Sequence, residues 1–281
     1  MNQTAQPTKT AAKQSSSEFL FRPYVGAGIN WYGAWILFSK ECQRFLKVYT
    51  QSILAPVSTT LLFLAIFTLA FGDRFIGTGT VSYGEFLAPG LIMMAILQNS
   101  FANSSSSLLI SKIQGNIVDL LMPPLSAGEL VTCITLAGIC RGLCVAISVA
   151  IGMYFFVDLS VSNPLALVFF AVAASMMMVL IGMITGVWAE KFDQMSMITN
   201  FIITPLAFLS GTFYSIDRLP GIWHDLSQWN PFFYAIDGFR YAFIGKADGN
   251  LWIGVTVLLT INIALLAVSV VMFRRGWKLK A

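Results

Sequence analysis

Six stretches of this chain are long and apolar enough to cross a lipid bilayer, and no other feature constrains its fold as strongly. A helix rises about 1.5 Å per residue, so about 20 residues cross a hydrocarbon layer about 30 Å thick. No charged residue occurs from Leu165 to Gly186 or from Leu251 to Phe273. The sequence therefore predicts an all-α polytopic membrane protein with transmembrane helices at about residues 50–72, 86–109, 130–157, 164–188, 197–216 and 250–273.

Composition and the placement of cations support this prediction. The chain is 57% hydrophobic and 11% charged, whereas about a quarter of the residues in a soluble domain are charged. Lys and Arg near span ends accumulate on the cytoplasmic side of a membrane. With the N-terminus inside, twelve of these cations lie inside and four outside, the outer four being Arg74, Arg218, Arg240 and Lys246. We therefore expect both termini in the cytoplasm, and we attribute the net charge of +4 to topology and not to nucleic-acid binding.

The first residues and the cysteines exclude two other arrangements. The first 17 residues are polar and lack the apolar core of a cleaved signal peptide. They predict a disordered cytoplasmic tail at residues 1–28, followed by one transmembrane domain at 29–281. Three of the four cysteines fall within one predicted span and Cys42 on the cytoplasmic side, so we expect no disulfide framework.

Residues 31–49 carry an apolar stripe at helical spacing. The stripe consists of Trp31, Trp35, Phe38, Cys42, Phe45 and Tyr49, while Arg44 and other polar residues lie off it. Tryptophans on an apolar face beside a basic face are typical of a helix lying in the headgroup plane. The alternative is a cytoplasmic extension of the first span.

The loop between the second and third spans carries a second stripe, formed by Ile110, Ile113, Ile117 and Leu121 (or Leu120). The segment is too short and polar to span a membrane, and Pro123-Pro124 ends it. Such a stripe has no core of its own, so it suits a peg that docks onto a soluble partner. A connector that follows the membrane surface is the alternative.

A third segment, between the last two spans, is rich in aromatic residues. Asn230-Pro231 is typical of a helix start and Gly245 of a helix end, and Asp237 and Arg240 have the spacing of an ion pair. We expect two short helices that re-enter the outer leaflet, with their aromatic side chains buried by protein. A plain interfacial aromatic belt is the alternative.

Arg141 lies near the middle of the third predicted span, where a charge costs at least about 2.5 kcal/mol unless it faces protein or water. A structural hydrogen-bonding role is the alternative to a functional one. The residues that we single out as candidates for a translocation pathway or gate are Arg141, Phe213, Tyr214, Trp229, Phe233, Tyr234 and Arg240.

Enzymatic features are missing from the sequence. It has no Gly-x-x-x-x-Gly-Lys-Ser/Thr phosphate loop, no metal-ligating cluster and no nucleophile with a plausible base. The spans also lack the buried acids that ion-coupled carriers use. We therefore expect no catalytic, cofactor or metal site, and an energy source outside this chain.

Several of these stretches together resemble the membrane subunit of the second type of ABC exporter. They are Tyr83 to Leu91, Gly115 to Pro124, Pro205 to Pro220 and, most specifically, Asn230 to Tyr241. The resemblance covers nearly all of residues 29–281. That group contains O-antigen, teichoic-acid, nodulation-factor and drug-export permeases, and the last stretch is most similar to YadH-like permeases, bacterial proteins usually labelled multidrug exporters.

The resemblance implies a homodimer in the bacterial inner membrane that contacts lipids and two copies of a separate ABC ATPase, which binds ATP and Mg. It implies that the peg is the ATPase-coupling helix, formed by Ile113, Gln114, Gly115, Asn116, Ile117, Asp119, Leu121 and Pro123. The expected function is export of an amphiphilic or lipid-linked molecule or drug. The alternatives are a polysaccharide exporter and a non-transporting regulator driven by an ABC ATPase.

The missing phosphate loop gives a direct test. The purified chain alone should neither bind nor hydrolyse ATP, because it has no loop to cradle the phosphates. Fluorescent-nucleotide binding and phosphate release would measure both, and co-purification with a nucleotide-binding subunit should restore turnover. Turnover by the contaminant-free chain would refute the permease assignment.

Overall fold

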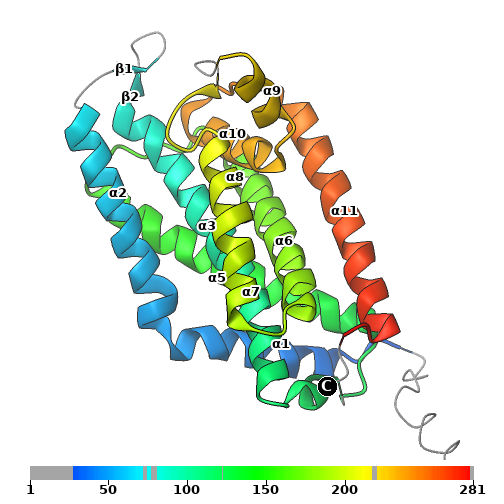
Figure 1. The fold of residues 1–281 in the computed structure, drawn as a ribbon. Coiled ribbons are helices and arrows are strands. Elements are labelled where there is room, and N and C mark those ends of the chain that lie inside the picture. Colours follow the sequence, from blue (N-terminus) through cyan, green and yellow to red (C-terminus); the bar gives the residue numbers. More distant parts are fainter. Residues whose placement is uncertain (1–27, 72–74, 77–80, 122, 217–219, 279–281) are drawn as a thin grey trace, which may run out of the picture.

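The computed structural model describes residues 28–71, 75–76, 81–121, 123–216 and 220–278 (Figure 1). The predicted tail, residues 1–28, lies outside this part of the chain except for Gly28. The described residues are helical apart from one antiparallel pair of two-residue strands, β1 (Phe75–Ile76) and β2 (Val81–Ser82). In that pair Phe75 lies opposite Ser82.

Five helices in the described residues are long and apolar enough to cross a membrane. They confirm five of the six predicted spans, close to the predicted bounds. They are the helix Thr50–Ala70, which combines the π-helical segment η1 (Thr50–Leu54) with most of α2 (Ala55–Phe71), and α3 (Tyr83–Ile113), α5 (Ala127–Tyr154), α6 (Pro164–Trp188) and α11 (Leu251–Arg275).

The remaining predicted span, 197–216, is not among these five. Here α7 (Phe192–Ile198), the π-helical segment η2 (Thr199–Ile203) and α8 (Thr204–Leu209) follow one another as one helical column (Figure 1). The column begins earlier than predicted and ends at Leu209. It cannot continue to 216 because Gly211 takes a left-handed conformation, with φ of 76°.

Both π-helical segments end two residues before a proline, η1 before Pro56 and η2 before Pro205. Proline has no backbone N–H and its ring clashes with the carbonyl four residues earlier. A wider turn accommodates that carbonyl, so the two prolines account for the two distortions of otherwise regular helices.

The short helices lie at the two ends of the bundle (Figure 1). At one end are α1 (Trp31–Lys47) and α4 (Ile117–Leu121), which share a core cluster through Leu37 and Ile117. At the other end are α9 (Ile222–Gln228) and α10 (Pro231–Ile244). The sequence prediction for α10 is confirmed: Asn230 caps it, Pro231 begins it, and Gly245 ends it in a left-handed conformation.

The centre of the fold is α3, whose most extensive packing is against α6. A methyl group on Gly182 of α6 would lie 2.6 Å from the carbonyl oxygen of Phe101, and one on Gly186 would lie 2.9 Å from that of Ser105. The two backbones therefore approach closely, and the hydroxyl of Ser104 donates to the Val179 carbonyl at 2.8 Å. Small residues and interhelical hydrogen bonds hold helices together where lipid removes the hydrophobic driving force.

This close approach predicts the effect of one methyl group. Gly182→Ala should destabilise the protein by about 1–3 kcal/mol, because the obstacle is backbone and cannot rotate away. Gly128→Ala is the matched control, since a methyl group on this helical residue meets no atom within 4 Å. It should be neutral, or stabilising by about 0.5–1 kcal/mol. Thermal unfolding of both detergent-purified variants measures the difference, and equal unfolding temperatures would contradict the packing described.

Candidate functional site

The helix α1 packs on the bundle through a face that coincides only partly with the predicted apolar stripe. Its buried residues are Leu37, Glu41 and Phe45, whereas Trp31 and Trp35 are 75% and 64% exposed. The predicted stripe is therefore divided, because Phe45 is turned into the protein and Phe38 is only partly buried. The face that packs inward includes a carboxylate, which a search for apolar periodicity does not find.

That carboxylate belongs to a polar cluster that fixes α1 on α3. Glu41 accepts hydrogen bonds from the Ser107 hydroxyl at 2.9 and 3.0 Å. Arg44 donates from Nε to Glu41 at 3.2 Å, and from Nη2 to the backbone and side-chain oxygens of Asn103 at 2.8 and 3.0 Å. The Asn and Ser residues of α3 were the available sequence signal, but the sequence does not indicate their partner on α1.

Arg141 of α5 reaches the same face of α3. Its Nη2 donates to Asn99 Oδ1 at 3.4 Å, one helical turn from Asn103. The other pathway candidates are Phe213, Tyr214, Trp229, Phe233, Tyr234 and Arg240, which lie on or near α8, α9 and α10 at the opposite end of the bundle. The structure therefore divides the predicted pathway residues between two regions.

The loop helix α4 is seated on the bundle by the residues that we expected to face a partner. Ile117 is 2% exposed and Leu120 is 6% exposed, both packed in a cluster with Leu37 and Leu108, and Leu121 is partly buried against it. The expectation of an unpartnered stripe was wrong for Ile117, which lies in one buried cluster with residues of α1, α3, α5 and α6, whereas Ile113 is exposed. The exposed residues of the predicted coupling segment are Ile113, Gln114, Gly115, Asn116 and Asp119, with Val118 beside them, while Pro123 is partly buried.

Lysines at this end of the bundle connect further helix ends. Lys112, next to the loop helix, donates to the carbonyls of Val187 and Ala189 at the end of α6, at 2.8 and 2.7 Å. Lys278, just beyond α11, donates to Glu190 at 3.1 Å. That hydrogen bond lowers the pKa of the exposed Glu190 carboxyl. These contacts join the ends of α3, α6 and α11.

At the opposite end of the bundle, side chains donate hydrogen bonds to the last backbone carbonyls of α8. Asn230 Nδ2 donates to Leu206 O at 2.8 Å, Ser227 to Leu209 O at 3.1 Å, and Thr212 to Ala207 O at 2.7 Å. The last carbonyls of a helix have no partner within the helix. The cap that begins α10 therefore also completes the end of α8.

Asp237 and Arg240 do not form the predicted ion pair. Arg240 donates from Nη2 to the Gly211 carbonyl at 2.6 Å, and its guanidinium carbon lies 3.9 Å from the centre of the Phe86 ring. Asp237 accepts from the backbone amides of Asp248 and Gly249 at 2.8 and 2.9 Å. Both side chains are 3% exposed, and each fixes a different loop against α10.

The aromatic residues near α8, α9 and α10 separate into a buried group and an exposed group. Phe213 contacts the rings of Phe67 and Phe208 at centroid distances of 4.9 and 5.3 Å, and its carbonyl accepts from Tyr83 at 3.1 Å. Phe233 is 4% exposed, as expected, but Trp229 is 87% exposed. The expected burial of Trp229 was wrong, since this residue follows the last turn of α9 and no helix covers it. Tyr214 donates to the Leu209 carbonyl at 3.3 Å. The ring centre of Tyr234 lies 5.1 Å from that of Phe233.

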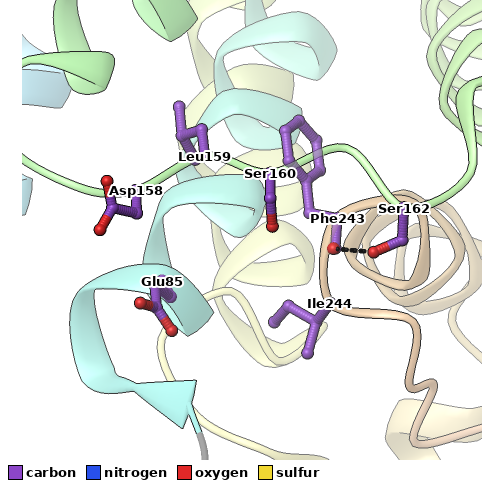
Figure 2. Close-up of a pocket in the computed structure, with 7 residues that line it drawn as sticks. All are labelled: Glu85, Asp158, Leu159, Ser160, Ser162, Phe243 and Ile244. Carbon is purple, nitrogen blue, oxygen red and sulfur yellow. Dashed lines mark hydrogen bonds between the residues drawn. The ribbon is translucent and has the colours of Figure 1, made fainter.

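A small cavity of about 200 Å³ lies nearby (Figure 2). Its lining comes from the start of α3, the loop after α5 and the end of α10, and consists of Glu85, Asp158, Leu159, Ser160, Ser162, Phe243 and Ile244. Glu85 is engaged in the capping box of α3 with Ser82, and Ser162 donates to the Phe243 carbonyl at 2.7 Å. None of the pathway candidates lines this cavity.

Among the described residues no three His, Cys, Asp or Glu side chains are grouped so as to hold a metal ion. The buried polar side chains instead pair helix ends and fix loops. The arrangement is that of a helical membrane bundle with a rigidly seated loop helix at one end and a capped helical hairpin at the other.

Comparison with known proteins agrees with this architecture. Residues 32–244 match the family model described as ABC-2 type transporter. The chain is 36% identical over 248 residues to "Inner membrane transport permease YadH" of Escherichia coli (strain K12), covering 88% of this chain and 97% of that protein. It is 24% identical over 258 residues to "Nodulation protein J" of Rhizobium leguminosarum bv. viciae, covering 88% and 95%. The chain therefore belongs to the ABC-2 type transporter family.

Proposed function

We propose that this chain is the permease subunit of an ATP-driven exporter in a bacterial inner membrane. The observation that carries the proposal is the loop helix α4, seated on the bundle by Ile117 and Leu120 with Val118 and Asp119 facing outward. A short helix held in this way transmits a force to the spans on either side of it. Family membership, and the inner-membrane permease of E. coli among its relatives, support the same function.

The proposed topology has six spans, with α7, η2 and α8 as the fifth. In this topology α1 lies in the inner headgroup layer with Trp31 and Trp35 in lipid, and α9 and α10 re-enter the outer leaflet. Support comes from the paired carbonyls at the end of α8, because a broken helix in lipid requires partners within the protein. Exposed Lys40, Lys47 and Arg274 at the α1 end support a cytoplasmic location for that end and for both termini.

Energy and assembly are assigned to partners. ABC-2 permeases normally work with an ABC ATPase, and we propose that two copies of such an ATPase bind ATP and Mg and drive a homodimer of this chain. The limited burial of the first and last spans supports an assembly that covers them: within one chain, 11% of an 18-residue apolar window of Thr50–Ala70 and 17% of such a window of Leu251–Arg275 are buried. The cargo that we propose is amphiphilic or lipid-linked.

A pair of substitutions on α4 tests the coupling role. Val118 is 54% exposed, so Val118→Asp should leave the chain folded and weaken its binding to a co-expressed ATPase about tenfold, through loss of one apolar contact. Ile117→Asp should instead destabilise the chain itself by about 2–4 kcal/mol, because it buries a charge in the cluster around Leu37. Co-purification, stimulated ATPase activity and thermal unfolding distinguish the two effects. Normal ATPase binding and export by a folded Val118→Asp variant would exclude α4 as the coupling helix.

Cysteine labelling tests the re-entrant hairpin. In a cysteine-free background, Trp229→Cys and Phe233→Cys should react slowly with an impermeant maleimide added outside, the first because it faces lipid and the second because protein covers it. Asp225→Cys is the matched control. Asp225 belongs to α9, the helix that Trp229 directly follows, and its side chain is 80% exposed. It should react fast. If Trp229→Cys reacts as fast as Asp225→Cys, α9 lies in water.

A further inference from the structure

Two guanidinium groups meet one face of α3 where α1 and α5 converge. Arg44 of α1 donates to Asn103 at 2.8 and 3.0 Å, and Arg141 of α5 donates to Asn99 at 3.4 Å, one turn away. The structure therefore brings two positively charged side chains to positions one helical turn apart on α3. Like charges in one region repel each other, and a neighbouring negative charge relieves that repulsion.

The protein supplies only part of that compensation. Glu41 is bound by Arg44 at 3.1 Å and by the Ser107 hydroxyl, so its carboxylate is already engaged. In the part of the chain that the structure describes, no carboxylate lies within ion-pairing distance of Arg141. Its hydrogen bond to Asn99, at 3.4 Å, is long for a charged donor. Arg141 therefore carries a positive charge within a span, and no described carboxylate neutralises that charge.

Three side chains near this face of α3 have a buried polar atom without a partner among the described residues, namely Arg141, Asn103 and Ser100, and each can donate a hydrogen bond. Arg141 Nε and Asn103 Nδ2 are buried and have no hydrogen-bond partner among the described residues. The acceptors are engaged, since Asn99 Oδ1 accepts from Arg141 and Asn103 Oδ1 accepts from Arg44, while Asn99 Nδ2 donates to the Ala95 carbonyl. A set of unused donors with one net positive charge matches an anion with several acceptor oxygens.

We propose that Arg141, Arg44 and Asn103 form a binding site for the phosphate of an anionic headgroup, carried by a membrane lipid or by a lipid-linked substrate. A guanidinium and a phosphate match in charge and in their paired hydrogen-bond geometry. Arg141 is only partly buried, which leaves part of its side chain accessible to a ligand. The assignment of this site to the inner leaflet rests on the topology proposed above. The assignment of the phosphate site to these three residues does not depend on that topology.

Lipid-dependent stability tests the site without any ATPase or transport. The full chain is placed in nanodiscs of phosphatidylcholine with and without phosphatidylglycerol, and its unfolding temperature and retained lipid are measured. Phosphatidylglycerol should stabilise the wild type, and Arg141→Gln should weaken that lipid's binding about tenfold or more, the effect of losing one charge-assisted hydrogen bond. Lys47→Gln is the control for general surface attraction, and it should respond to the lipid as the wild type does.

The variants also separate binding from folding. In phosphatidylcholine alone Arg141→Gln should unfold at or above the wild-type temperature, because it removes an uncompensated charge. If it does not fold, Arg141→Lys keeps the charge but loses the planar fork, and should bind phosphatidylglycerol more weakly than the wild type.

The source of the phosphate is read from a second arm with inorganic phosphate and pyrophosphate. Stabilisation by these ions that depends on Arg141, without an effect of phosphatidylglycerol, would assign the site to a soluble phosphate. Equal stabilisation of the wild type and Arg141→Gln by phosphatidylglycerol would overturn the proposal, as would no response to either source. Failure of ATPase coupling through α4 leaves this binding result intact, so the two proposals fail separately.

Discussion

The close contact between α3 and α6 is the interaction on which the rest of the structure depends. Gly182 and Gly186 let the two backbones meet, and Ser104 adds a hydrogen bond from α3 to the Val179 carbonyl. This pair forms the centre against which α5 and α10 pack. A bundle in lipid gains little from burying leucine, because lipid is equally apolar, so close contact and interhelical hydrogen bonds must supply the stability. The polar residues in the middle of α3 are therefore structural as well as available for function.

A second constraint shapes the end of the molecule where α9 and α10 lie. A helix that stops within an apolar environment leaves carbonyl groups that must find partners in the protein. Asn230 satisfies this requirement for α8 and begins α10 with the same side chain, since its Oδ1 accepts from Phe232 and its Nδ2 donates to Leu206. Arg240 pairs the Gly211 carbonyl in the next turn of the chain. The hairpin is thus held by specific hydrogen bonds to backbone, and its aromatic side chains fill the space between.

The sequence predicted the features that depend on local signals. Hydropathy located five spans, and Asn230, Pro231 and Gly245 located both ends of α10, because capping chemistry is local. Predictions that required knowing which neighbour covers a face failed. Periodicity found Ile117 but could not show that it is buried in a cluster with residues of other helices. Spacing placed Asp237 near Arg240 without revealing that backbone groups bind each of them. The partnership of Glu41 with Ser107 joins residues far apart in the chain, and no local pattern encodes it.

The arrangement at the α1 end supports the proposed coupling role of α4. Ile117 of α4 and Leu37 of α1 belong to one buried cluster with Leu130 of α5. Lys112, at the end of α3, is bound to the last carbonyls of α6. If α4 transmits motion as proposed, its displacement should be passed to the helices that share these contacts. Because Arg44 of α1 binds Asn103 one turn from the contact of Arg141 with Asn99, the same displacement should alter the separation of the two arginines.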